Sequence, residues 1–451
     1  MRQVETQGKR NSRGDLETLL KDLEPKVIEY RRNIHKHAEA GWMEYYTASL
    51  VAKELENLGI EVRMGQEVVD AESRMGVPDA KTLERAHERA LQEGADPKYV
   101  ERMQGGFTGV VGIIRNGNGP TLGFRFDMDA VEVGESGSEE HLPARLGFAS
   151  LHPEAMHACG HDGHTAIGLG LSHALSALKD QLRGTVILIF QPAEEGARGA
   201  KAMMATGIVD EVDFLFGVHI GVKATTTGEF YCGSDGFLAT SKLDAYFQGH
   251  SVHAGLAPQD GRNALLAAAT AVLNLHAIPR HGEGETRINV GKLVAGSGRN
   301  VIPSDAHLVL ETRGKNGEID RYMREYAERI LHHAASMHEV ECRIQRMGEG
   351  LDAISDEELV DAVFSLAQKH RIFTHLKRKV TEFGGSEDFT HLMRRVQSKG
   401  GKATYLMLGS KLAGNHHTQT FDFDETCLIK GVEILARLAL EGEWKGRTSQ
   451  S

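Results

Sequence analysis

Short apolar runs that end abruptly in polar residues recur along this chain. Four of them stop at or lead to side chains that can bind a metal or carry a proton: PTLGFRFDMDA (120–130), TVILIFQPAEEG (185–196), DFLFGVHIG (213–221) and KATYLMLGS (402–410). Nearly continuous apolar runs of this length are typical of strands covered on both faces. Helix-like stretches such as 47–59 and 164–180 lie between them. This alternation predicts an α/β fold with a mainly parallel sheet, whose ligands collect at the carboxyl ends of the strands.

The rhythm changes between residues 239 and 348. Strand-like and helix-like stretches follow one another there in the order β-α-β-β-α-β, which is the ferredoxin-like arrangement. We therefore expect an inserted lid and dimerisation domain over 239–348. The catalytic metal-binding domain then comes in two parts, 15–238 and 349–445. A charged stretch over 72–106 interrupts its first part and is predicted to form helices joined by turns.

Composition excludes several classes of protein. With 451 residues, 40% of them hydrophobic, the chain can bury substantial cores in two or more domains. The net charge of -11 argues against nucleic acid as the main partner. No apolar run is long enough for a membrane span, and the polar start MRQVETQGKRNSRGD lacks the apolar stretch of a secretory signal. We expect a frayed tail on a cytoplasmic protein. The cysteines 159, 232, 342 and 427 are too scattered for a disulfide framework.

The segment MHACGHDGH (156–164) is unusually rich in groups that bind metals. Cys159 and His161 lie two residues apart, with a glycine between them that allows a tight turn. Thiolate and imidazole both suit zinc and similar ions. A Cys-x-His pair supplies only two ligands, however, and a buried cysteine beside a helix-capping segment is the alternative.

The adjacent acids Glu194 and Glu195 follow a buried strand. Two neighbouring carboxylates are costly there unless a cation compensates them. Beside a dication, one carboxylate can bind the metal while the other takes a proton from water. The alternative is a solvated acidic helix start, favoured by the helix dipole.

Two further histidines complete a candidate metal centre. His219 ends an apolar run and His417 lies in AGNHHTQTFDFDE; with the residues above they make five potential ligands, Cys159, His161, Glu195, His219 and His417. Five ligands exceed what one catalytic zinc takes and suit a pair of bridged ions. Asp127 is interpreted as a group that orients a ligating histidine, and His416 as a weaker alternative to its neighbour.

The inserted segment carries polar residues suited to a substrate. His253 lies in a glycine-rich loop from which it could reach a carbonyl, while Asn300 and Arg313 could bind a carboxylate. Taken singly, each could equally be a loop polar residue or a charge on a strand surface.

Several motifs together resemble a known family. MHACGHDGHTA, FQPAEEGARGAKAM, GVHIG, the His-Ala-Gly segment at His253, NVIP and GGSEDF are similar to the two-metal aminoacylase and carboxypeptidase family, in the branch of hippurate hydrolases and indole-acetyl-amino-acid amidohydrolases. The resemblance covers about 16–444. Within that branch, SRMGVPD, GGFTG and HHTQTFDFDE look most like enzymes acting on p-aminobenzoyl-glutamate. Ala38 departs from the pattern, which usually has proline there.

The resemblance implies a role for each candidate residue. The five candidate ligands match the family's metal ligands for two divalent ions, Mn²⁺ or Zn²⁺, and Glu194 matches its general base. Asp127 matches the supporting aspartate. His253 matches a residue that stabilises the oxyanion, often across a dimer interface, and Asn300 and Arg313 match positions near the substrate carboxylate. A homodimer, or a heterodimer with a homologous second chain, is expected.

The substrate implied is a small acyl-amino acid, expected to be p-aminobenzoyl-glutamate, and indole-3-acetyl-aspartate is the alternative with the same mechanism. Two other interpretations stay open. A thiol hydrolase would use Cys159 as nucleophile, which leaves Glu194 and His219 without a shared purpose. A non-catalytic binding protein would keep the fold and lose the reaction.

Overall fold

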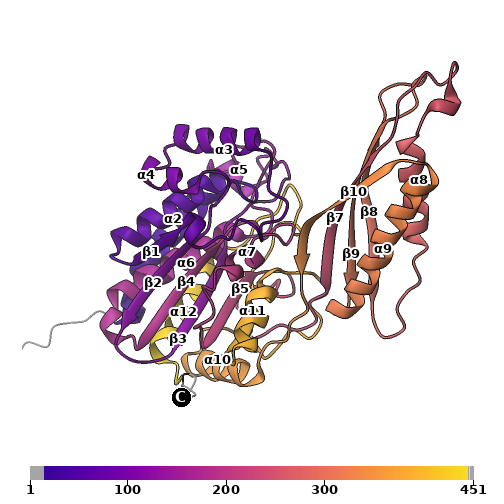
Figure 1. Cartoon of the computed structure of the whole chain (residues 1–451). Helices are drawn as coiled ribbons and strands as arrows, with labels where there is room; N and C mark the ends of the chain where they lie inside the picture. Colours follow the sequence, from indigo (N-terminus) through magenta and orange to yellow (C-terminus); the bar gives the residue numbers. More distant parts are fainter. Residues whose placement is uncertain (1–14, 445, 447–451) are drawn as a thin grey trace, which may run out of the picture.

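The computed structural model describes residues 15–444 and 446, and the tail expected before residue 15 lies outside them. Two bodies lie side by side, a larger α/β body and a smaller one built on four strands (Figure 1). Within the described residues, no helix combines the length and apolarity needed to cross a bilayer.

The larger body contains one eight-stranded sheet. Its strands lie in the order β1 (Glu61–Met64), β2 (Val110–Asn116), β4 (Gly184–Gln191), β3 (Thr121–Asp127), β5 (Phe214–Ile220), β12 (Lys402–Leu408), β6 (Glu229–Tyr231) and β11 (His375–Lys377). The four central strands, β4 to β12, are parallel, as the apolar runs predicted. Antiparallel pairs occur where β1, β2 and β6 join the sheet.

Helices cover both faces of this sheet. Side chains alternate along β4, so that Val186 and Leu188 enter one hydrophobic cluster while Ile187 and Ile189 enter the other. The first cluster receives residues of α1 (Leu16–Lys36), α2 (Tyr45–Asn57), α6 (His161–Ala177), α10 (Glu357–His370) and α12 (Thr426–Glu441). The second receives those of α7 (Ala200–Ala205) and α11 (Phe389–Ser398). Burial on both faces explains why the central strands are almost wholly apolar.

The charged stretch over 72–106 folds into short helices beside α2. They are α3 (Ala80–Gln92), α4 (Pro97–Val100) and the 3-10 turn η2 (Glu101–Met103). Asp79 caps α3 by accepting the backbone N–H of Lys81 and Thr82, and Asp96 caps α4. The remaining short elements are η1 (Gly65–Glu67), α5 (Leu142–Leu146), η3 (Lys179–Gln181) and η4 (Pro258–Asp260).

The smaller body has its own sheet and core. Its elements follow in the order β7 (Ala239–Gln248), α8 (Ala264–His276), β8 (Thr286–Ala295), β9 (Asp305–Gly314), α9 (Gly317–Met337) and β10 (Glu341–Gly350). The strands lie in the order β10-β7-β9-β8, and every neighbouring pair is antiparallel. Leu243 and Leu308 of the sheet share a buried cluster with Ala268 of α8 and Met323 of α9. Strand β8 forms one edge of this sheet (Figure 1).

Candidate metal centre

The carboxyl ends of the central strands meet at one edge of the large sheet. Asp127 at the end of β3 pairs in register with Gln191 at the end of β4, and Ile220 of β5 pairs with Leu408 of β12. The segments that follow these strands therefore converge. They line a cavity of about 580 Å³ together with the segment before α6. Its lining includes Cys159, Glu194, Glu195, His219, His416 and His417.

Cys159 lies between two groups of possible ligand atoms. Its sulfur is grouped with nitrogens of His161 and His219, all within 4.8 Å of one another, and separately with Glu195 and His417 within the same limit. The Sγ–Nε2 distance to His219 is 3.6 Å, and Nε2 of His417 lies 3.3 Å from Oε1 of Glu195. All five candidate ligands thus come together around one thiol. Gly160 makes this possible, because its φ of 89° turns the chain into α6 between Cys159 and His161.

The hydrogen bonds leave the right atoms free to bind a metal. Nδ1–H of His161 donates to the carbonyl of Asp129 at 2.8 Å, and Nδ1–H of His219 donates to the carbonyl of Ile220 at 2.8 Å. Each ring then presents the lone pair of Nε2 to the cluster. Nε2 of His161 and Oε1 of Glu195 are buried and have no hydrogen-bond partner among the described residues. Buried polar atoms seldom stay unpaired, so these donor atoms fit a bound cation.

His417 suits a ligand better than its neighbour does. The backbone N–H of Val222 donates to Nε2 of His416 at 2.9 Å, and Nδ1 of His416 lies 3.6 Å from Sγ of Cys159. Burial lowers the pKa of His416 to about 4, so this ring is neutral. A neutral ring that accepts at Nε2 carries its proton on Nδ1 and has no lone pair left for a metal.

Asp127 contacts a different histidine from the candidate ligands. Nδ1–H of His164 donates to Oδ1 of Asp127 at 2.5 Å, while Ile220 N–H donates to Nε2 of the same ring at 2.8 Å. Both nitrogens of His164 are therefore occupied. The second carboxylate oxygen of Asp127 lies 3.8 Å from Nε2 of His161 and is paired with Arg125. The group that orients His161 directly is Asp129.

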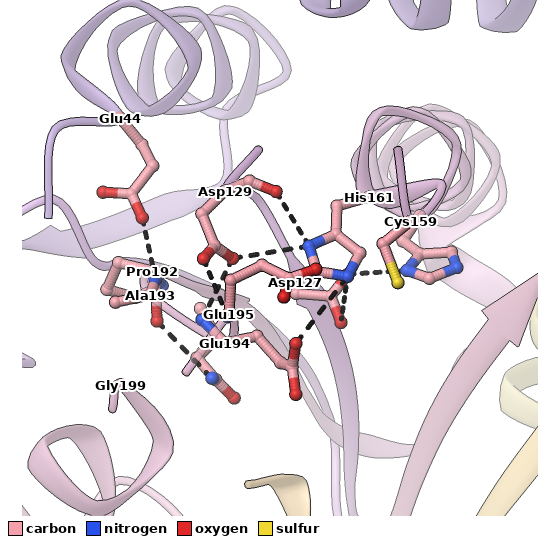
Figure 2. A network of polar contacts seen from close by, with 12 residues as sticks. Glu44, Asp127, Asp129, Cys159, His161, Pro192, Ala193, Glu194, Glu195 and Gly199 are labelled. Atoms are coloured by element: carbon pink, nitrogen blue, oxygen red, sulfur yellow. Dashed lines mark hydrogen bonds and ion pairs between the residues drawn. The ribbon is translucent and has the colours of Figure 1, made fainter. Parts of the chain in front are cut away.

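Two buried carboxylates hold the loop that carries the glutamate pair (Figure 2). Glu44, at the start of α2, accepts the Ala193 N–H at 2.7 Å and the Thr108 hydroxyl at 2.5 Å. Asp129 accepts the N–H groups of Glu194 and Glu195 at 3.0 and 2.9 Å. Three consecutive amides are thus fixed, and Ala193 is held at a φ of 53°. The sequence analysis missed Glu44, whose only local signal is an acid at a helix start.

Glu194 lies among carboxylates. Its Oε2 is 3.9 Å from Nε2 of His161. Burial, followed by the charges of Glu387 and Glu195, raises the pKa of Glu194 well above its usual range. Arg125 partly compensates this negative charge, since its guanidinium contacts Asp127 and Glu387. A dication beside Glu194 would favour its ionised form, which is the form needed to accept a proton.

The three residues predicted in the inserted segment divide into two groups. Arg313 lines the cavity and pairs with Glu311, with 2.9 Å between Nε and Oε1. His253 and Asn300 are exposed, belong to two loops bridged by hydrogen bonds, and do not line the cavity. Within one chain, the structure therefore brings Arg313 to the site and leaves His253 and Asn300 outside it.

Comparison with known proteins places this geometry in a family. The model of peptidase family M20/M25/M40 matches residues 123–441. One of the subunits of the p-aminobenzoyl-glutamate hydrolase of Escherichia coli K12 is 47% identical over 95% of this chain and 98% of its own length. The indole-3-acetyl-aspartic acid hydrolase of Enterobacter agglomerans is 46% identical over 95% and 99%. The crystal structure of an aminobenzoyl-glutamate utilization protein from Klebsiella pneumoniae superposes with a TM-score of 0.83 at 42% identity, covering 96% of this chain and 100% of that one.

Proposed function

Because this chain belongs to peptidase family M20/M25/M40, we propose that it is a metal-dependent amidohydrolase acting on an aromatic acyl group joined to an acidic amino acid. The observation that carries the proposal is the grouping of five ligand atoms around Cys159, with Glu194 beside them. The thiol, imidazole and carboxylate groups suit zinc or manganese, and the otherwise unpaired atoms of His161 and Glu195 are donors that such a cation would engage.

The ligands divide between two ion positions that share Cys159. His161 and His219 would hold one divalent ion, and Glu195 and His417 the other. When bound, such ions polarise the amide carbonyl and lower the pKa of a water molecule in the site. Glu194 takes the proton of the attacking water and later delivers it to the departing amine nitrogen. Glu44 and Asp129 keep this carboxylate in place by fixing the backbone of its loop.

The smaller body is proposed to be the ferredoxin-like lid and dimerisation domain, spanning 239–348. His253 and Asn300 are too remote to serve the site of their own chain, so they would serve that of a second chain, where His253 steadies the oxyanion. The surface for such a partner includes the free edge of β8 and the exposed side chains of α8, Leu265, Leu266 and Leu273. The partner would be a second copy or a homologous protein.

The substrate we propose is p-aminobenzoyl-glutamate, with indole-3-acetyl-aspartate as the second candidate. The relatives named above act on these two amides by their names, and the chain is almost equally similar to both. The test is a comparison of kcat/KM on the glutamate and aspartate conjugates of p-aminobenzoate and indole-acetate, after loading with Mn²⁺ or Zn²⁺. Failure of the loaded protein to cleave any of the four amides would overturn the proposal.

The thiol-hydrolase alternative fits the site less well. Burial raises the pKa of Cys159, which disfavours the free thiolate that a nucleophile needs. A chelator separates the two chemistries: EDTA should abolish metal-dependent turnover, whereas a thiol enzyme would survive EDTA and be inactivated by iodoacetamide.

A further inference from the structure

The cavity that contains the metal ligands is also lined by three positively charged side chains. Lys242 of β7 and Arg313 of β9 come from the smaller body, and Lys223 follows β5 of the larger one. Lys242 and Arg313 share one carboxylate, since both contact Oε2 of Glu311 at 3.2 Å. One negative charge is thus set against two positive charges there, which leaves an excess of one.

Lys223 has no such neutralising partner. Among the described residues, no carboxylate forms an ion pair or hydrogen bond with its ammonium group, and its side chain is exposed. It also lines a neighbouring cavity of about 590 Å³, which shares Lys223 and Gly384 with the first. The ammonium group is therefore available to an anion that enters the metal-containing cavity.

The backbone fixes Lys223 relative to the metal centre. The preceding residues, Gly221 and Val222, have φ values of 77° and 55°. A β-branched residue rarely adopts this left-handed conformation, which persists only where the surroundings impose it. Here the N–H of Val222 donates to His416, whose other nitrogen faces Cys159. The turn that carries Lys223 is thus tied to the candidate ligand cluster, four residues after His219.

We infer that Lys223 makes the enzyme selective for acidic amino acids, by binding the side-chain carboxylate of the amino-acid half of the substrate. The inference rests on the proposed function and names the group that reads this part of the substrate. A conjugate of glutamate or aspartate carries two carboxylates. The excess charge at Lys242 and Arg313 serves the α-carboxylate, and Lys223 supplies the second cation. Its flexible stem can follow carboxylates that differ in position by one methylene.

The test uses two substrates of equal shape, p-aminobenzoyl-glutamate and p-aminobenzoyl-glutamine. Lys223→Met should lower kcat/KM for the glutamate conjugate by roughly 10- to 100-fold, mostly through KM, as expected for a lost charge-assisted hydrogen bond. The glutamine conjugate should change less than about twofold, because a neutral amide gains little from the ammonium group. Lys223→Arg should recover most of the loss. Lys315→Met is the matched control, since this exposed lysine lines only the neighbouring cavity of the two.

Equal losses on the two substrates, or no loss on either, would overturn the role of Lys223. The proposed function fails separately, if the wild-type protein loaded with metal cleaves neither amide. In that event, calorimetric binding of the two conjugates to the wild type and to Lys223→Met decides the inference. A preference for the glutamate conjugate that disappears in the variant supports it, and an unchanged preference refutes it.

Discussion

Replacing Glu44 by alanine removes the acceptor of two buried donors, the Ala193 N–H and the Thr108 hydroxyl. Each donor left unpaired costs about 1–3 kcal/mol. Loss of the buried carboxyl group, which is itself costly, offsets part of this, so we expect a net loss of about 2–4 kcal/mol in the free energy of unfolding. The loop of Glu194 also loses one of its anchors. A misplacement of about 1 Å can reduce the rate roughly 100-fold, so kcat should fall by that order.

The assay compares the kcat of folded protein with thermal stability and metal content. Glu39 provides a matched control, since it is equally buried and accepts two backbone N–H groups of α2, those of Tyr46 and Thr47. Glu39→Ala should lose comparable stability and keep its kcat within about twofold, because Glu39 does not contact the loop. Equal losses of kcat in the two variants would show that Glu44 acts only through general stability.

Glu44 also predicts a pH dependence of stability. Burial, and then the charge of Asp129, raise the pKa of Glu44 to about 8. In the unfolded chain this carboxyl titrates near its ordinary value of about 4.5. The folded state therefore holds one more proton between these pH values, and this contribution to stability is lost as the pH rises from about 4.5 to 8. Glu44→Gln should flatten that part of the stability profile measured by denaturant titration. An unchanged slope would show that Glu44 titrates normally.

Three further predictions concern the metal, the base and the partner. Loading Zn²⁺ into the metal-free protein should release protons, seen with a pH indicator in weak buffer, because the thiol of Cys159 must ionise and hydrogen bonds to Cys159 and Glu195 raise the pKa of His417 to about 10; no release would contradict this ligand set. Glu194→Gln should lose roughly 10²- to 10⁴-fold in kcat while its metal content by mass spectrometry stays unchanged, and a matching loss of metal would make Glu194 a ligand instead. If His253 serves a second chain, specific activity should fall on dilution below the dimer dissociation constant, and monomers that keep full activity would refute that role.

The sequence predicted the convergence of the site for a simple geometric reason. Parallel strands end at the same edge of a sheet, so apolar runs that stop at Asp127, Glu194 and His219 must place those residues together. The antiparallel pairing of β1, β2 and β6 was beyond reach, because short edge strands carry little periodic signal. Glu44 was missed because its bonds to Ala193 and Thr108 span 149 and 64 residues of chain.

The distribution of roles between Asp127 and Asp129 shows where sequence reasoning stops. Residues two apart on an extended segment point the same way, so either carboxylate could support a histidine of α6. The fold decides: Asp127 binds His164, which in turn accepts the N–H of Ile220, while Asp129 binds His161 through its carbonyl and the glutamate loop through its carboxylate. Asp127 therefore joins β3, α6 and β5 into one rigid frame. Asp129 couples a candidate ligand to the candidate base, so its replacement by asparagine should disturb metal binding and proton transfer together.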